Sequence, residues 1–148
     1  MGPGAEMAGE HGEFSGACHC GRLQVRFTTL LAAERLVPRA CDCSFCQKHG
    51  AAYVSDPRGA LRMTLPAGLA PYRQGAGNAQ FHVCDHCGVL VAVTYENEAG
   101  RRFGTVNVRC LDAAASFPPP QPASPQALPP EERTARWRQL WVPDVVVA

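Results

Sequence analysis

The chain has 148 residues, of which 46% are hydrophobic and 18% are charged, so its length and composition fit one globular domain. It contains no run of about 18 apolar residues, and we therefore expect no membrane partner. The formal charge of +1 and the single lysine, Lys48, exclude the strong positive field that is typical of nucleic-acid binding, so no nucleic-acid partner is expected either.

The predicted elements of the first part of the chain are mostly β-strands. Residues 1–14 are rich in Gly, Ala and Glu, and we expect them to form a flexible N-terminus ahead of a domain over residues 15–116. Apolar residues that alternate with polar ones predict half-buried strands at 23–27, 61–65 and 106–108. The continuously apolar run Val89–Val93 predicts a strand that is covered on both faces. Turn signals at 56–59 and 75–78 separate these runs. The predicted fold class is mainly β, a small and mainly antiparallel β-fold.

The C-terminal part of the chain differs in composition from the rest. Seven of the fourteen residues of 117–130 are proline, which predicts a stiff linker. Pro130 and the two glutamates after it favour a helix start, so we expect a short C-terminal helix in the tail 131–148. One face of this helix would carry Trp137, Leu140 and Trp141. We expect this face to pack on the domain or on a second copy of the chain, which would make a homo-oligomer. The alternative is an interaction tail that uses Arg133, Arg136 and Arg138.

Seven of the eight cysteines fall into three short groups. These are Cys18-x-Cys20, Cys41-x-Cys43-x-x-Cys46 and Cys84-x-x-Cys87. Cysteines one residue apart are awkward disulfide partners, and residues 1–17 have no apolar stretch like that of a signal peptide. We therefore expect reduced thiols in the cytoplasm, where clustered cysteines more often bind metal. Cys110 stands alone and is expected to be an ordinary buried thiol.

Seven thiolates divide into one closed zinc site of four ligands and one open site of three. Gly21 follows Cys20 and Gly88 follows Cys87, so both outer pairs end in a residue that can turn sharply and aim backbone N–H groups at sulfur. This similarity predicts that Cys18, Cys20, Cys84 and Cys87 hold a structural zinc ion. Two Zn²⁺ and seven thiolates would bring the formal charge of the chain to about −2.

The middle triplet has a different context. Ser44 and Gln47 stand three residues apart, as in a capping box that opens a short helix, and Gly50 would end it. Cys46 would then lie in the first helical turn, where the helix dipole favours a thiolate. Three soft ligands suit zinc and leave its fourth position open. The alternative is a second structural site that is completed by a histidine: His49, three residues after Cys46, or else His19, His82 or His86.

The cysteine motifs, taken with their neighbours, resemble those of a known family. Gly16-Ala17-Cys18-His19-Cys20-Gly21, the segment from Cys41 to Gly50 and Phe81-His82-Val83-Cys84-Asp85-His86-Cys87-Gly88 are similar, in order and spacing, to the glutathione-dependent formaldehyde-activating enzyme family, which also contains centromere protein V. The resemblance implies a β-tent fold with two zinc ions per chain. It implies a structural zinc at Cys18, Cys20, Cys84 and Cys87 and a catalytic zinc at Cys41, Cys43 and Cys46.

The resemblance also implies a reaction. Its product would be S-(hydroxymethyl)glutathione, made from glutathione and formaldehyde by a carbon–sulfur lyase, an activity that detoxifies formaldehyde. Because glutathione carries two carboxylates, cations are expected near the open site. The candidates are Arg22, Lys48, Arg58, Arg101 and Arg102. No general base is evident, although His49 is a better candidate for proton handling than Asp42. Two alternatives remain: a zinc-stabilised binding module without catalysis, and a redox sensor that loses zinc from the open site on oxidation.

Overall fold

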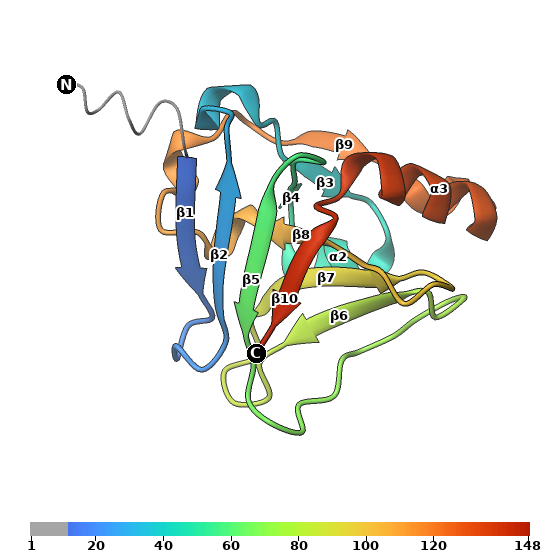
Figure 1. Cartoon of the computed structure of the whole chain (residues 1–148), viewed down its shortest axis with the longest axis horizontal. Helices are drawn as coiled ribbons and strands as arrows, with labels where there is room; N and C mark the ends of the chain where they lie inside the picture. Colours follow the sequence, from blue (N-terminus) through green and yellow to red (C-terminus); the bar gives the residue numbers. More distant parts are fainter. Residues whose placement is uncertain (1–11) are drawn as a thin grey trace.

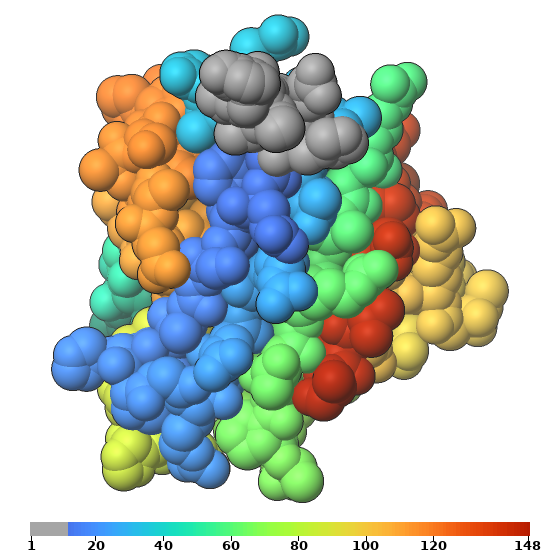
Figure 2. All heavy atoms as spheres, turned by 60° about the vertical axis from the view of Figure 1, so that its left-hand side comes forward, coloured from blue at the N-terminus to red at the C-terminus, as the bar shows by residue number. Residues whose placement is uncertain are grey.

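Two β-sheets frame the molecule in this computed structural model, which describes residues 12–148. The first sheet has four strands in the order β1–β2–β5–β10. Their bounds are β1 Gly12–Ala17, β2 Gln24–Thr29, β5 Ala60–Thr64 and β10 Asp144–Val147. In Figure 2 the four strands lie side by side as blue, light-blue, green and red bands.

The second sheet has six strands in the order β6–β7–β8–β4–β3–β9. Their bounds are β6 Ala79–Val83, β7 Leu90–Glu96, β8 Arg102–Asn107, β4 Tyr53–Val54, β3 Arg39–Cys41 and β9 Gln121–Ala123. In Figure 1, β6 and β7 run across the direction of the first sheet's strands. The helices of the described chain are α2 Ser44–His49 and α3 Pro130–Leu140, with short 3₁₀ turns η1 Ala33–Arg35, η2 Val108–Cys110, η3 Ala114–Ser116 and η4 Pro125–Ala127. The mainly β fold class with one short C-terminal helix is confirmed.

The apolar alternation of the sequence gives the first core its residues. β2 and β5 pair antiparallel with Val25 opposite Met63 and Phe27 opposite Leu61, and all four side chains are buried. They pack against Val106 and other residues of the six-stranded sheet, so the core lies between the two sheets.

The six-stranded sheet is covered on its other face as well. A second buried cluster there includes Val93 and Tyr95 of β7, Cys46 of α2 and Trp141, which follows α3. This second cover explains why β7 is buried at every position but its last, as the apolar run predicts. The prediction of a half-buried strand at 106–108 is wrong. One face of β8 packs in the core between the sheets and the other in the second cluster, and at Val108 the chain already enters η2.

The C-terminal segment returns to the domain. β9, which lies within the proline-rich segment 117–130, pairs parallel with β3, and β10 pairs parallel with β5. The aromatic face of α3 packs on its own chain, with the Trp137 ring 4.6 Å from that of Trp141 and 5.8 Å from that of Tyr95. The chain therefore buries Trp141 and covers part of Trp137 with its own residues.

The start of the described chain lies slightly before the predicted domain start, because β1 begins at Gly12. The rest of the predicted flexible N-terminus, residues 1–11, lies outside the described residues. No helix between residues 12 and 148 is long and apolar enough to span a membrane.

Candidate metal centres and the adjoining cavity

Four cysteines from two turns meet at one side of the sheets. Cys18 and Cys20 follow β1, and Cys84 and Cys87 lie between β6 and β7. Their sulfur atoms all lie within 4.8 Å of one another, with 3.7 Å between Cys18 and Cys20 and 3.6 Å between Cys20 and Cys84. A tetrahedral site with zinc–sulfur bonds of about 2.3 Å has sulfur atoms about 3.8 Å apart. A disulfide needs about 2.05 Å. The four-cysteine group thus has the spacing of a metal site, and all its thiols are free.

The backbone around the four-cysteine group has the conformation that the glycines predict. Gly21 has a φ of 87° and Gly88 a φ of 83°, a region that other residues rarely adopt. The turns aim N–H groups at sulfur: Leu23 N donates to Cys18 Sγ at 3.3 Å and Cys87 N to Cys84 Sγ at 3.4 Å. The N–H groups of Cys87 and His86 lower the pKa of Cys84. The turn after β6 therefore favours a thiolate at Cys84, and the thiolate is the form that binds metal.

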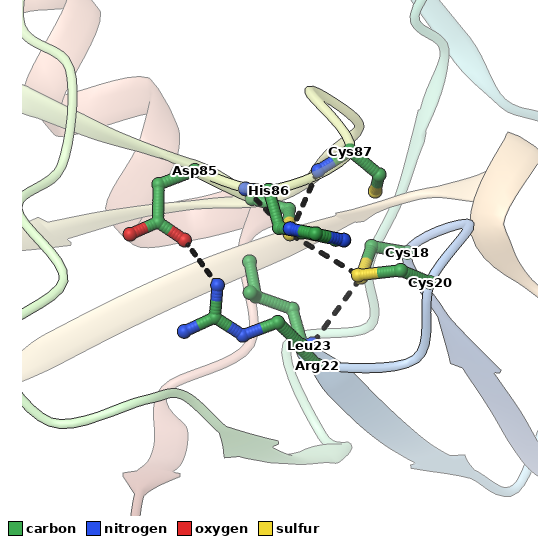
Figure 3. A network of polar contacts seen from close by, with 8 residues as sticks. Cys18, Cys20, Arg22, Leu23, Asp85, His86 and Cys87 are labelled. Atoms are coloured by element: carbon green, nitrogen blue, oxygen red, sulfur yellow. Dashed lines mark hydrogen bonds and ion pairs between the residues drawn. The ribbon is translucent and has the colours of Figure 1, made fainter.

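One ion pair joins the two cysteine-bearing turns. Arg22 Nη1 lies 2.8 Å from Asp85 Oδ1, and both side chains are exposed to solvent. Figure 3 shows this pair to one side of the cysteines, with the Cys87 side chain on the opposite side. Arg22 is thereby engaged at the four-cysteine group and is not available to a substrate near the other cysteines.

The other three cysteines lie where β3 leads into α2. Cys41 ends β3, Cys43 caps α2 and Cys46 is in its first turn, and their sulfur atoms lie within 4.8 Å of one another. The predicted helix is present, and Gly50 ends it with a φ of 61°. The predicted capping box is wrong, because Cys43 and not Ser44 is the N-cap. Cys43 Sγ accepts the N–H of Cys46 at 3.3 Å, which is the role that a cap oxygen usually plays.

Two further donors hold the sulfur atoms of the three-cysteine group. The Tyr53 hydroxyl lies 3.1 Å from Cys46 Sγ, and Gln74 Nε2 donates to Cys43 Sγ at 3.4 Å. Hydrogen bonding between Cys41 and Cys46 lowers the pKa of Cys41 to about 6 and raises the pKa of Cys46. The group therefore already stabilises one thiolate.

Within residues 12–148, no imidazole belongs to the three-cysteine group. The His49 ring is exposed and packs on Phe45 with 4.6 Å between ring centroids. His82 is buried in β6, where it lies 2.8 Å from Thr94 Oγ1, and burial lowers its pKa to about 4. His19 and His86 are exposed beside the four-cysteine group. The two cysteine groups thus differ in the number of ligand atoms they bring together, four in one and three in the other.

A cavity of about 670 Å³ adjoins the three-cysteine group. This volume lies in the range of small-molecule sites. Its walls come from β3, β4, the loop 74–79, the segment 122–126 and α3, and Cys41, Cys43 and Cys46 all line it. Trp137 and Trp141 form an apolar part of the wall.

Three arginines, Arg39, Arg133 and Arg136, line this cavity, and no Asp or Glu of the described chain does. Arg39 is half-buried; its guanidinium donates to Ser55 Oγ at 2.8 Å and to Thr105 Oγ1 at 3.4 Å. Burial, helped by the nearby charge of Arg136, lowers the pKa of Arg39 to about 10, so it stays charged at neutral pH. The three ion pairs found in residues 12–148 all involve other arginines. The cavity therefore carries net positive charge beside the thiols.

The cations named from the sequence lie elsewhere: none of Arg22, Lys48, Arg58, Arg101 and Arg102 lines the cavity. Arg101, for example, lies over the Phe103 ring at 5.7 Å. Arg133 and Arg136 were singled out only as parts of an interaction tail. Arg39 was missed, although its place two residues before Cys41 was a usable signal.

Comparison with known proteins agrees with this arrangement. The sequence model of the family "Glutathione-dependent formaldehyde-activating enzyme" matches residues 13–127, which include both cysteine groups. The chain belongs to this family. Family membership supports a function related to glutathione and formaldehyde and fits the finding that both cysteine groups could hold metal ions.

One solved structure has a fold similar to that of this chain. A crystal structure of a Rhodobacter sphaeroides protein is similar, with a TM-score of 0.52 and 28% identity over 66% of this chain and 87% of that one. No curated protein matches. The part of the chain that follows residue 127, which includes α3 and its two cavity arginines, lies outside the family match.

Proposed function

We propose that this chain is a zinc-dependent enzyme of the carbon–sulfur lyase type that adds glutathione, or a closely similar thiol, to formaldehyde. The observation that carries the proposal is the three-cysteine group, which has no fourth protein ligand in the described chain and lines a cavity with three arginines. Family membership supports the choice of glutathione and formaldehyde.

The proposal assigns different roles to the two cysteine groups. Cys18, Cys20, Cys84 and Cys87 would hold a structural zinc ion, because four sulfur atoms complete its preferred shell. Cys41, Cys43 and Cys46 would hold the second ion. Zinc bound by three cysteines keeps a position for a thiol and lowers the pKa of that thiol.

The reaction needs little from the protein beyond a thiolate and correct placement. The glutathione sulfur forms a bond to the formaldehyde carbon, the carbonyl π electrons move to oxygen, and that oxygen takes a proton to give S-(hydroxymethyl)glutathione. The thiol proton lost on binding balances the one gained. Tyr53 and Gln74 fix the orientation of Cys46 and Cys43, and Trp137 and Trp141 shield part of the cavity from water. The main contribution to rate is therefore proximity.

A direct test measures the exchange between glutathione, formaldehyde and their adduct by NMR. We expect the intact protein to accelerate the exchange and Cys46→Ser to abolish the acceleration. Cys110→Ser is the matched control, since Cys110 is a buried cysteine outside both groups whose sulfur donates to Leu90 O at 3.2 Å. Equal exchange rates with the intact protein and Cys46→Ser would refute the catalytic role of the three-cysteine group.

Metal content tests the zinc requirement separately. Elemental analysis of protein isolated under reducing conditions should give two zinc ions per chain. A value near one, with the central cysteines oxidised, would favour the redox sensor instead.

A further inference from the structure

The C-terminal helix is the part of the cavity wall that family membership does not account for. α3 begins at Pro130, beyond the family match at residue 127, yet it contributes two of the three cavity arginines. We propose that α3 completes a carboxylate-binding site in which Arg136 and Arg39 select acidic peptide thiols over neutral ones, with Asn78 accepting an N–H of the peptide. This inference rests on the proposed function and adds the residues that determine specificity.

The first step of the argument concerns charge. A partly buried guanidinium is costly unless an anion compensates for it, and among residues 12–148 the hydrogen bonds of Arg39 go only to the neutral hydroxyls of Ser55 and Thr105. No carboxylate of the described chain lines the cavity. Three thiolates and one Zn²⁺ would supply only about one negative charge beside the three cavity arginines. An anionic ligand can supply the rest, and a planar carboxylate matches the fork of a guanidinium.

The three arginines do not have the same freedom. Arg133 donates to two backbone carbonyls, that of Pro125 at 3.1 Å and that of Leu128 at 3.0 Å, and so holds the segment before α3 in place. Arg136 is exposed at the cavity and pairs with no carboxylate of residues 12–148. Arg39 and Arg136 are thus the pair that can take a ligand carboxylate, while Arg133 positions the wall.

An unpaired acceptor gives independent support. Asn78 lines the same cavity, and its Oδ1 is the one buried side-chain oxygen or nitrogen of the described chain without a hydrogen-bond partner. Leaving such an atom unpaired is unfavourable, so a ligand N–H that reaches Oδ1 would be stabilised by it. A thiol that is part of a peptide brings amide N–H groups together with its carboxylates, whereas a simple acid thiol does not.

The first experiment measures binding without catalysis. S-methylglutathione keeps both carboxylates and both amide N–H groups but has no free thiol, so it probes the arginines and Asn78 alone. Calorimetric titration of the zinc-loaded full chain should show that Arg136→Gln weakens its binding by about tenfold or more, the effect of losing a charge-assisted hydrogen bond. Arg138→Gln is the matched control: it lies on the same helix and donates to Tyr95 at 3.2 Å, but it does not line the cavity.

A second variant separates binding from folding. Asn78→Ala should weaken S-methylglutathione binding while its thermal unfolding midpoint stays equal to or above that of the parent, because the acceptor it removes is unpaired. Equal affinity of the parent and Arg136→Gln would overturn the inference. If Asn78→Ala lost folding stability but bound S-methylglutathione as tightly as the parent, the proposed role of Asn78 in ligand binding would be wrong.

Different results would refute the enzyme proposal and the carboxylate-site inference. If the inference is right, the parent enzyme should favour glutathione over 2-mercaptoethanol in the NMR exchange assay, and Arg136→Gln should raise the KM for glutathione alone. Equal losses for both thiols in Arg136→Gln would contradict the inference and leave the enzyme proposal intact. Tight S-methylglutathione binding without acceleration of exchange for any thiol would refute the enzyme proposal and leave the carboxylate site intact.

Discussion

Replacing Tyr53 with phenylalanine removes one hydroxyl from the three-cysteine group and keeps the ring. The hydroxyl lies 3.1 Å from Cys46 Sγ, and the side chain is only 6% exposed, so water cannot easily replace the lost donor. A hydrogen bond to a charged group contributes about 1.5–3 kcal/mol, which is a factor of roughly 10–100 in a binding constant. Groups that orient metal ligands have effects of similar size. We therefore expect Tyr53→Phe to weaken zinc binding at this group about tenfold or more.

Competition with a coloured chelator measures this effect, since the two zinc ions should be released in separate steps. The four-cysteine group is an internal reference and should keep its zinc unchanged. Tyr72→Phe is the matched control, because Tyr72 is 50% exposed and its ring, 4.8 Å from that of Phe45, would keep its packing when the hydroxyl is removed. If Tyr53→Phe and the parent released their weaker zinc at the same chelator concentration, the argument that Tyr53 stabilises the Cys46 thiolate would be wrong.

Three further predictions concern stability, and denaturant unfolding measures each of them. Trp141→Ala should lower the free energy of unfolding by about 3–5 kcal/mol, because Trp141 is 6% exposed and stacked on Trp137; a change below about 1 kcal/mol would show that the tail is not part of the fold. Gly88→Ala should cost about 1–2 kcal/mol from its φ of 83°, and an unchanged midpoint would contradict the required turn. Asp85→Asn should change stability by less than about 1 kcal/mol, because its ion pair with Arg22 is exposed; a larger loss would mean that this pair fixes the four-cysteine group.

The features that the sequence predicted well depend on neighbouring residues. Alternation places Val25, Phe27, Leu61 and Met63 on the core face of β2 and β5 because strand periodicity is local. The separation of the cysteines into a group of four and a group of three also follows local signals, the glycines that end the two outer pairs.

The features that it missed depend on how distant segments meet. β8 is buried at every position but its first because distant residues cover both of its faces, which its own residues do not encode. Arg39 and Arg136 come together only because the proline-rich segment folds back along β3 and brings α3 over the cavity. The N-cap was misplaced for a different reason: the sulfur of Cys43 takes a role that sequence rules give to oxygen.

The central claim is that a small thiol can join the three sulfur atoms of Cys41, Cys43 and Cys46 at one metal ion. The most direct measurement is the visible absorption spectrum of protein in which cobalt replaces zinc at this group. Adding glutathione should change the cobalt bands as a fourth sulfur binds, whereas S-methylglutathione, which has no free thiol, should leave them nearly unchanged. Bands that stay the same at saturating glutathione would contradict the claim.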